Sequence, residues 1–314
     1  MNTSAQERGA VVMTGASSGI GEASALLLAR AGFHVFAGVR REEDARALAG
    51  RATGRLTPLL LDITDSTQIR SAAETVAELV GDRGLAGLVN NAGVGVAWPL
   101  EVVPLDEFRR QFEVNVFGHL AVTQAFLPLL RAATGRIVNV GSVGGRITMP
   151  FGGTLSAPRH ALVAVNDALR MELSPWGIHV VLIEGGSIAT RAVDKLETSA
   201  EAVLRQLSAV DRARYADAYR TAVARAVART RAGSPPEVVA RAVLRALTEH
   251  TPKTRYPVGA DTRLLLTLAA ILPDRLLDRV RLRSFGLPGH FGAPGQPQAS
   301  GRARDAVSTG GVDV

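Results

Sequence analysis

The chain of 314 residues contains no cysteine. This absence excludes disulfide bonds and thiolate chemistry, and it is consistent with a reducing compartment. The N-terminus lacks the basic and apolar pattern of a signal peptide, and no window of about eighteen uninterrupted apolar residues occurs. We therefore expect a cytoplasmic protein without a transmembrane segment.

Lysine and tyrosine are scarce. The lysines are Lys195 and Lys253, and the tyrosines are Tyr215, Tyr219 and Tyr256. Arginine carries the basic charge instead, and the formal net charge is +7. The arginines are dispersed and mixed with acidic residues, without a dense basic block or interleaved aromatic residues. This pattern predicts solvated faces and no nucleic-acid binding.

Short runs rich in Val, Ile and Leu recur along the chain and alternate with helix-periodic segments. They lie at residues 11–13, 34–39, 57–61, 87–89, 135–140, 179–183 and 255–258. Such alternation predicts an α/β fold with a doubly wound, Rossmann-like parallel sheet covered by helices on both faces. Ligands of such sheets bind beyond the carboxyl ends of the strands, so the residues that follow each strand are the candidates for a site.

A glycine-rich turn follows the first predicted strand and precedes an Ala/Leu-rich helix. Glycine lets the backbone approach an anion, and the N-terminus of the helix attracts negative charge. The turn therefore predicts a phosphate site, although glycine turns that serve packing alone also occur, and the spacing differs from G-x-G-x-x-G. The candidate cofactor-binding residues are Gly15, Ser17, Ser18, Gly19, Ile20 and Gly21.

Two arginines, Arg40 and Arg41, follow the second predicted strand. The adenosine ribose of a dinucleotide lies at this place, where an acidic residue would select a free 2′-hydroxyl. Guanidinium groups pair with a 2′-phosphate, so we predict NADP(H) rather than NAD(H). The alternative is a pair of solvent-exposed arginines at the start of a helix.

Polar residues also follow the later strands. Asp62 closes the third, Asn91-Ala92-Gly93 follows the fourth, and Ser142 follows the fifth; Asn115 lies in a long helical stretch over residues 107–131. In order and separation, these motifs and the glycine turn resemble the short-chain dehydrogenase/reductase family.

The resemblance implies a role for each of these residues. Asp62 would contact adenine, residues 91–93 would meet the cofactor, Asn115 would hold a water near a catalytic lysine, and Ser142 would bind substrate. The alternatives are a turn or helix cap for Asp62 and a satisfied polar core group for Asn115.

The family pattern breaks about a dozen residues after the serine, where the family has Tyr-x-x-x-Lys. Positions i and i+4 share a helix face, so the lysine lowers the pKa of the tyrosine, which exchanges the carbonyl proton. Leu155 and Arg159 occupy these positions. Leu155 has no proton to donate, and Arg159 keeps its charge, so it would hold a ribose hydroxyl without titrating. Ordinary ketone reduction is expected to be impaired by about 10² to 10⁴.

Two further departures lie near these positions. Pro158 predicts that the helix begins near residues 154–156 or is deformed there. Gly185 stands where the family usually has proline and predicts a more flexible loop. The resemblance still assigns Ile188 and Thr190 to the cofactor, Thr190 as the contact of the nicotinamide.

The rest of the chain is assigned by order and composition. The helix-rich residues 192–232 match the family's substrate lid and carry Tyr215 and Tyr219, which we read as packed or solvated phenols. Residues 263–283 are amphipathic; we favour packing on the same domain or on a partner subunit over a membrane-surface helix. We predict one domain over residues 1–285 and a flexible tail over residues 286–314.

Three functions remain open from the sequence. The first is an NADP(H)-binding oxidoreductase that reduces an activated acceptor, such as an iminium or a conjugated compound, without a tyrosine proton. The second is a non-redox catalyst, a cyclase or isomerase, with NADP(H) structural or absent. The third is a non-enzymatic protein that senses NADP(H). A small apolar or polycyclic substrate is expected and no metal is, and the family implies a homodimer or homotetramer.

Overall fold

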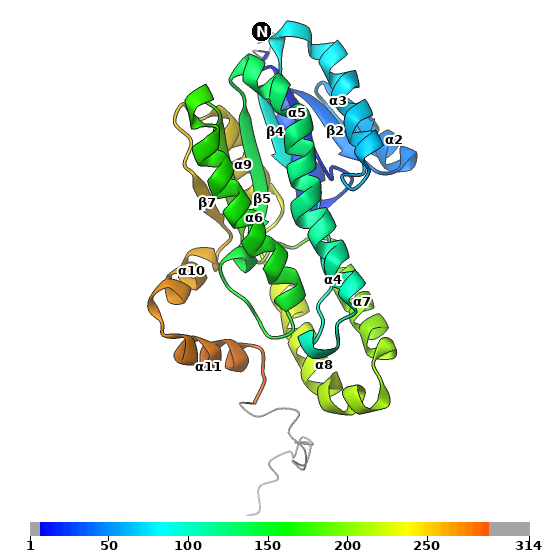
Figure 1. The fold of residues 1–314 in the computed structure, drawn as a ribbon, viewed down its shortest axis with the longest axis vertical. Helices are drawn as coiled ribbons and strands as arrows, with labels where there is room; N and C mark the ends of the chain where they lie inside the picture. The colour runs from blue at the N-terminus through cyan, green and yellow to red at the C-terminus, as the bar shows by residue number, and fades with distance from the viewer. Residues whose placement is uncertain (1–6, 289–314) are drawn as a thin grey trace, which may run out of the picture.

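The computed structural model describes residues 7–288 and contains a seven-stranded sheet in which all strands are parallel (Figure 1). The predicted α/β, doubly wound class is therefore confirmed. The strands follow the order β3-β2-β1-β4-β5-β6-β7, so the winding reverses between β1 and β4. Their bounds are Ala10–Met13 (β1), His34–Val39 (β2), Leu56–Leu60 (β3), Gly87–Asn90 (β4), Arg136–Ser142 (β5), His179–Gly185 (β6) and Arg255–Val258 (β7).

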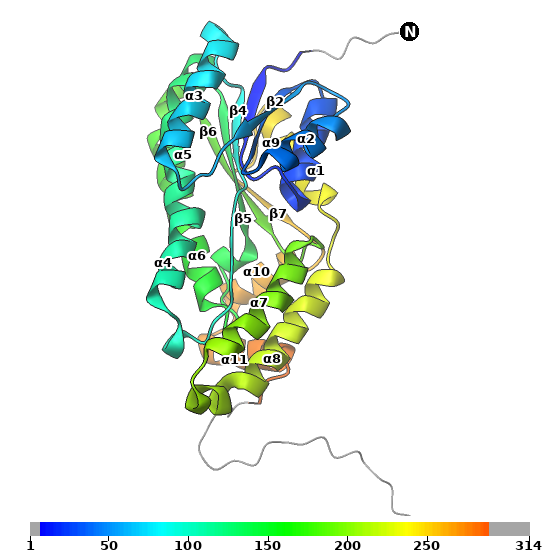
Figure 2. The ribbon, with the colours of Figure 1, turned by 90° about the vertical axis from the view of Figure 1, so that its right-hand side faces the viewer.

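Helices cover both faces of this sheet, as Figure 2 shows. One face packs against α1 (Gly19–Arg30), α2 (Glu42–Arg51) and α9 (Glu237–Thr248). The other face packs against α3 (Ser66–Val80), α5 (His119–Ala133) and α6 (Gly153–Glu172). Because both faces are buried, the central strands are continuous apolar runs rather than alternating ones.

Three buried asparagines join β4, β5 and α6 inside the second layer. Asn90 Nδ2 donates to Asn139 Oδ1 at 3.0 Å, and Asn139 Nδ2 donates to Asn166 Oδ1 at 3.0 Å. These two bonds link α6 through β5 to β4, although Asn90 Oδ1 and Asn166 Nδ2 at the ends of the chain of bonds have no partner among the described residues. Helix α6 carries Leu155 and Arg159, and the asparagines therefore set where those side chains lie.

The predicted helix over residues 107–131 is a continuous stretch in three parts. Helix α4 (Leu105–Phe112) is followed by a π-helical turn, η3 (Glu113–Gly118), and then by α5. By length and mean hydropathy this stretch could cross a membrane, but core helices meet the same criteria. Val122, Phe126 and Leu130 are buried against the sheet, so we assign the stretch to the core. The predicted absence of a transmembrane segment stays a prediction.

The helical pair α7 (Ala192–Gln206) and α8 (Ala209–Arg231) lies beyond the carboxyl ends of the strands (Figure 2). Its apolar side chains form a separate buried cluster with residues 96–98 and with the partly buried Leu155. Residues 192–232, predicted to be helix-rich, therefore lie on the same side of the sheet as the candidate site.

The predicted amphipathic segment over residues 263–283 forms two helices, α10 (Thr262–Ile271) and α11 (Asp274–Ser284). After α11, Phe285 and Leu287 are buried against Ala222 of α8. Within the segment itself Leu264, Ile271, Leu276 and Val280 are exposed, so packing on the same domain or on a partner subunit stays a prediction. The domain boundary predicted at residue 286 stays a prediction, and residues 289–314 of the predicted tail lie outside the described residues.

The packing of α5 predicts a large difference between two phenylalanines of the same helical stretch. Phe126 is fully buried, whereas Phe117 is 54% exposed. We expect Phe126→Ala to lower the free energy of unfolding by about 3–5 kcal/mol, because it removes buried surface and leaves a cavity. Phe117→Ala should lower it by less than about 1 kcal/mol. Urea denaturation followed by circular dichroism measures both; equal losses would contradict the assignment of α5 to the core.

Candidate cofactor and active site

The glycine turn between β1 and α1 has no room for side chains at two of its glycines. A Cβ atom on Gly21 would lie 2.0 Å from the carbonyl oxygen of Gly15, and one on Gly15 would lie 2.7 Å from Ala92 Cα. Gly15 and Gly19 also have positive φ values of 66° and 56°, which favour glycine. The turn exposes backbone N–H groups at the start of α1, which has no side-chain cap at Ser18. This geometry suits a phosphate.

Thr14 and Asn91 hold the turn against the loop after β4. Thr14 Oγ1 accepts from the backbone N–H groups of Asn91 at 3.0 Å and Ala92 at 3.1 Å. Asn91 Nδ2 donates to the carbonyl oxygens of Thr14 at 3.1 Å and Gly15 at 3.0 Å. The structure therefore brings the predicted cofactor residues 15–21 and 91–93 together, and the amide of Asn91 is used to join them.

The two arginines after β2 differ in their partners. Arg41 pairs with Asp44 at 2.9 Å and with Glu43 at 2.7 Å, and the bond to Asp44 raises its pKa. Arg40 is exposed and makes no ion pair within residues 7–288. The sequence did not distinguish the two arginines, whereas the structure leaves the guanidinium of Arg40 available to an incoming anion.

Asp62 follows β3 and stabilises the turn in which it lies. Its Oδ1 accepts from the backbone N–H of Thr64 at 2.9 Å and from the Thr64 hydroxyl at 2.7 Å. The contacts of Asp62 are therefore those of a turn cap, which was the alternative interpretation of this residue. An adenine contact stays a prediction.

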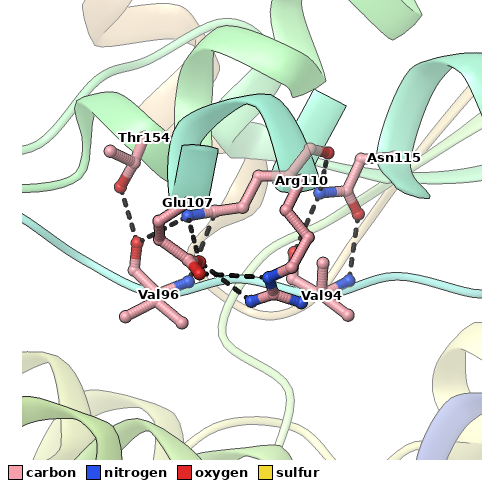
Figure 3. Close-up of polar contacts among 7 residues, drawn as sticks. Val94, Val96, Glu107, Arg110, Asn115 and Thr154 are labelled. Atoms are coloured by element: carbon pink, nitrogen blue, oxygen red, sulfur yellow. Dashed lines mark hydrogen bonds and ion pairs between the residues drawn. The ribbon is translucent and has the colours of Figure 1, made fainter. Parts of the chain in front are cut away.

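Asn115 lies in η3 and binds the backbone of the extended segment after Gly93 (Figure 3). Its Oδ1 accepts from Val94 N at 3.1 Å, and its Nδ2 donates to Val94 O at 2.9 Å and to Gln111 O at 2.8 Å. Asn115 is thus a satisfied, buried polar group, as the alternative reading held. Its water-holding role stays a prediction.

Gln111 and Thr154 hold the same extended segment two residues further on, at Val96. Gln111 Nε2 donates to Val96 O at 3.1 Å, and the Thr154 hydroxyl donates to the same oxygen at 2.6 Å (Figure 3). Side chains from α4, η3 and α6 therefore fix the backbone of residues 94–96 beside Leu155. The sequence reasoning missed both residues, because buried glutamine and threonine carry no distinctive motif.

His119 is a further residue that the sequence reasoning missed. It begins α5, is 4% exposed, and its Nε2 lies 2.6 Å from the carbonyl oxygen of Ala92. Burial lowers its pKa, so the ring is neutral and Nε2 carries the proton that this carbonyl accepts. His119 therefore holds the loop of residues 91–93 at the carbonyl group of Ala92, whose N–H is bound by Thr14. In the sequence, only its position four residues after Asn115 could have indicated that His119 lies near the site.

Ser142, Leu155 and Arg159 come together where β5 ends and α6 begins. A Cβ atom on Gly144 would lie 3.3 Å from Arg159 Cδ and 3.6 Å from Ser142 Oγ. Ser142 Oγ accepts from Gly144 N at 3.1 Å. Leu155 packs against the next loop, because a Cβ atom on Gly95 would lie 2.4 Å from its Cδ2.

Arg159 brings an uncompensated positive charge into this region. Its Nη1 donates to the carbonyl oxygen of Leu155 at 2.6 Å, and no carboxylate pairs with it within the described part of the chain. Burial lowers its pKa, but a guanidinium starts so high that it remains protonated near neutral pH. The site therefore contains a fixed cation and, at Leu155, an apolar wall.

One expectation about the nearby backbone agrees to within one residue, and one is corrected. Helix α6 begins at Gly153, one residue before the predicted start near residues 154–156, so Pro158 lies just beyond the first turn and the helix continues through Glu172. Gly185 is the last residue of β6 and pairs in register with Ser142 and Val258. It therefore belongs to the sheet and not to the flexible loop that the sequence predicted.

The loop after β6 returns to the glycine turn. Ile188 is buried and forms a parallel bridge with Ser234. Thr190 lies against the turn, because a Cβ atom on Gly19 would be 3.3 Å from its Cβ and Cγ2 atoms. Of the two predicted residues, the structure therefore places Thr190 against the turn.

The tyrosines of α8 have partners other than the candidate site. Tyr219 is 1% exposed and donates to Ala97 O at 2.8 Å, and burial raises its pKa. Tyr215 donates to Glu101, which raises its pKa as well. Both rings pack edge-on against Phe151. The reading of these phenols as packing groups fits this arrangement.

Comparison with known proteins gives a consistent result. Residues 9–201 match the family model described as short chain dehydrogenase. Retinol dehydrogenase 5 of Mus musculus is 38% identical over 276 residues, which cover 86% of this chain and 86% of that protein. The NADPH-dependent 3-dehydrocapnine reductase of Ornithobacterium rhinotracheale is 35% identical over 283 residues, or 86% of this chain and 94% of that protein.

Solved structures agree with this result. A short chain dehydrogenase from Burkholderia cenocepacia in complex with NADP has a TM-score of 0.65 and 26% identity, covering 88% of this chain and 98% of that one. The chain therefore belongs to the short-chain dehydrogenase/reductase family and is an oxidoreductase of its NAD(P)-dependent type.

Proposed function

We propose that this protein is an NADP(H)-dependent reductase of activated acceptors that accept a hydride without an enzymic proton. The observation that supports this proposal is the side chain of Leu155, which packs on Gly95 and lies one helical turn before Arg159. In this proposal Leu155 and Arg159 occupy the positions of the family's tyrosine and lysine. Neither supplies a proton near neutral pH.

The cofactor half of the site fits a dinucleotide phosphate. Gly15 and Gly21 leave a backbone cradle that a Cβ atom would fill, and the start of α1 offers free N–H groups. Arg40 would pair with a 2′-phosphate, since its guanidinium has no carboxylate partner among the described residues. When bound, NADPH supplies a hydride. The residues of the chain bind and orient it.

The substrate half offers hydrogen bonds and a fixed charge. Ser142 Oγ accepts from Gly144 N, which leaves the serine proton for an acceptor atom of the substrate. The Arg159 guanidinium would hold a hydroxyl group at its edge. An iminium carbon becomes neutral when a hydride is added, so no proton is needed. A ketone becomes an alkoxide, which Leu155 cannot protonate.

The expected substrate is largely apolar. Leu155 packs against the buried cluster of α7 and α8, which contains Val203, Leu204 and Tyr219. The names of the relatives point the same way: retinol dehydrogenase 5 and estradiol 17-beta-dehydrogenase 2 refer to apolar ring compounds. We propose a small apolar or polycyclic molecule with an activated acceptor group.

A non-redox reaction is the second candidate, and one observation favours it. The unpaired Arg159 cation beside the apolar wall of Leu155 would suit a cyclase or isomerase that holds a reactive substrate. In that case product would form while NADPH absorbance stays constant. Product formed in step with NADPH oxidation would exclude it for that substrate.

The proposal predicts different rates of NADPH oxidation for two acceptors with the same bicyclic skeleton. N-methyl-3,4-dihydroisoquinolinium is cationic and needs no proton, whereas 2-tetralone is a neutral ketone. We expect NADPH oxidation with the iminium to be faster by about 10² or more, because general acid catalysis contributes about 10² to 10⁴. Absorbance at the NADPH band measures both rates. A ketone rate equal to or above the iminium rate would contradict the proposal.

Restoring the family residues should restore ketone reduction. We expect Leu155→Tyr with Arg159→Lys to raise the 2-tetralone rate by about 10², while the iminium rate changes little. The control is Leu155→Phe with Arg159→Lys, which adds a similar ring without a hydroxyl group. Equal ketone rates in the two variants would show that the missing proton is not the cause.

The two arginines after β2 should contribute unequally to cofactor binding. Arg40→Gln is expected to weaken NADPH binding about tenfold, since one charge-assisted bond to the 2′-phosphate contributes about 1.5 kcal/mol or more. Arg41→Gln should weaken it less, because Asp44 and Glu43 already occupy that guanidinium. Fluorescence titration gives both constants. NADH, which lacks the 2′-phosphate, serves as the control and should respond to neither change.

A further inference from the structure

A hollow of about 420 Å³ lies along β7, the edge strand of the sheet, on the face covered by α9. Its apolar lining comes from Val238 and Ala242 of α9 and from the ring of Tyr256. Tyr256 belongs to the buried cluster beneath α1 and α9, whereas the asparagine-linked α6 covers the opposite face. The hollow is therefore separate from the region of Leu155 and Arg159.

Cationic side chains surround this apolar floor. Arg241, Lys253 and Arg263 line the hollow, are exposed, and make no ion pair within residues 7–288. Arg245 also lines it, but it pairs with Glu249 at 2.7 Å and lies over the Tyr256 ring. No acidic residue belongs to the lining.

Arg255, the one cation of β7, also lines the hollow but is neutralised by carboxylates. Its guanidinium pairs with Asp167 at 2.6 Å and with Glu184 at 3.2 Å. Strand residues alternate between the two faces, so Arg255 points toward α6 and Tyr256 toward α9. The charge without an ion pair at the hollow therefore comes from Arg241, Lys253 and Arg263, of which Lys253 lies in the field of Glu249.

We propose that this hollow binds a small organic anion with an apolar body. The body would lie on the floor formed by Val238, Ala242 and Tyr256. A phosphate or carboxylate group would be held by the three unpaired cations at the rim. Small-molecule sites are usually concave and mostly apolar, with a small number of polar groups that orient the ligand. This site does not depend on the reductase activity proposed above.

The cations near β7 have an alternative explanation, because charged side chains at a sheet edge discourage pairing with the edge of a second sheet. That purpose needs no concave floor and no apolar lining. A second copy of the chain could also cover β7, and it would have to bring carboxylates to the three cations. The experiment below separates both explanations from ligand binding.

Calorimetric titration of phenyl phosphate into the full chain at low ionic strength tests the proposal. Phenyl phosphate combines a ring with a dianion, and phenol is its neutral control. We expect phenyl phosphate to bind and phenol not to bind. Arg241→Gln with Arg263→Gln should weaken phenyl phosphate at least about tenfold, since two charged contacts together contribute about 1.4 kcal/mol or more. Arg70→Gln with Arg279→Gln removes the same charge elsewhere and should leave the affinity unchanged.

Several results would overturn the proposal. These are no binding by the unaltered chain, equal weakening in both double variants, or weakening only in Arg40→Gln, which would place the anion in the cofactor site. A complex between copies that dissociates only in Arg241→Gln with Arg263→Gln, without binding of phenyl phosphate, would assign the hollow to an interface. NADPH affinity should be unchanged in that double variant, so a failure here leaves the proposed function untouched.

Discussion

The close approach of the β1–α1 turn to the loop after β4 is the constraint on which the rest of the site depends. Gly15 meets Ala92 so closely that a Cβ atom does not fit, and Thr14 and Asn91 hold the two segments by four hydrogen bonds. This contact lies where the winding of the sheet reverses, and it exposes the N–H groups of α1. His119 binds the same loop at the carbonyl oxygen of Ala92. The geometry of the phosphate cradle therefore depends on the neighbouring strands β1 and β4 and their loops, and not on the glycine turn alone.

The second half of the site depends on where α6 is held. The buried chain of Asn90, Asn139 and Asn166 fixes α6 to the strands, and Gln111, Asn115 and Thr154 fix residues 94–96 beside it. Leu155 then packs between that segment and the apolar cluster of α7 and α8. Buried polar residues thus hold α6 and the segment beside it in place. The side chain that they position is apolar, and this combination supports a reaction in which hydride acceptance needs no enzymic proton.

The sequence predicted the sheet well because strand periodicity and the residues after each strand are local signals. The glycine turn, Asn91 and Ser142 were recognisable for the same reason; the structure joins the turn to Asn91 and places Ser142 near Arg159. Other features depend on contacts between distant segments. Asn115 binds the backbone of Val94, and Gly185 pairs with Val258 of β7; both are contacts between distant segments that no local pattern encodes. The ion pair of Arg41 with Asp44 is local, but the sequence alone did not distinguish the paired arginine from its neighbour Arg40. His119 was missed because a single histidine in a helix is uninformative until its burial is known.

The central claim is that no titratable group contacts the acceptor atom of the substrate. A crystal structure with NADPH and 2-tetralone bound tests it most directly, by recording every polar atom within about 3.5 Å of the ketone oxygen. The account predicts that the Ser142 hydroxyl is the only side-chain donor there and that Leu155 lies against the ring. A tyrosine hydroxyl, a histidine nitrogen or a carboxyl group at hydrogen-bond distance from that oxygen would contradict it.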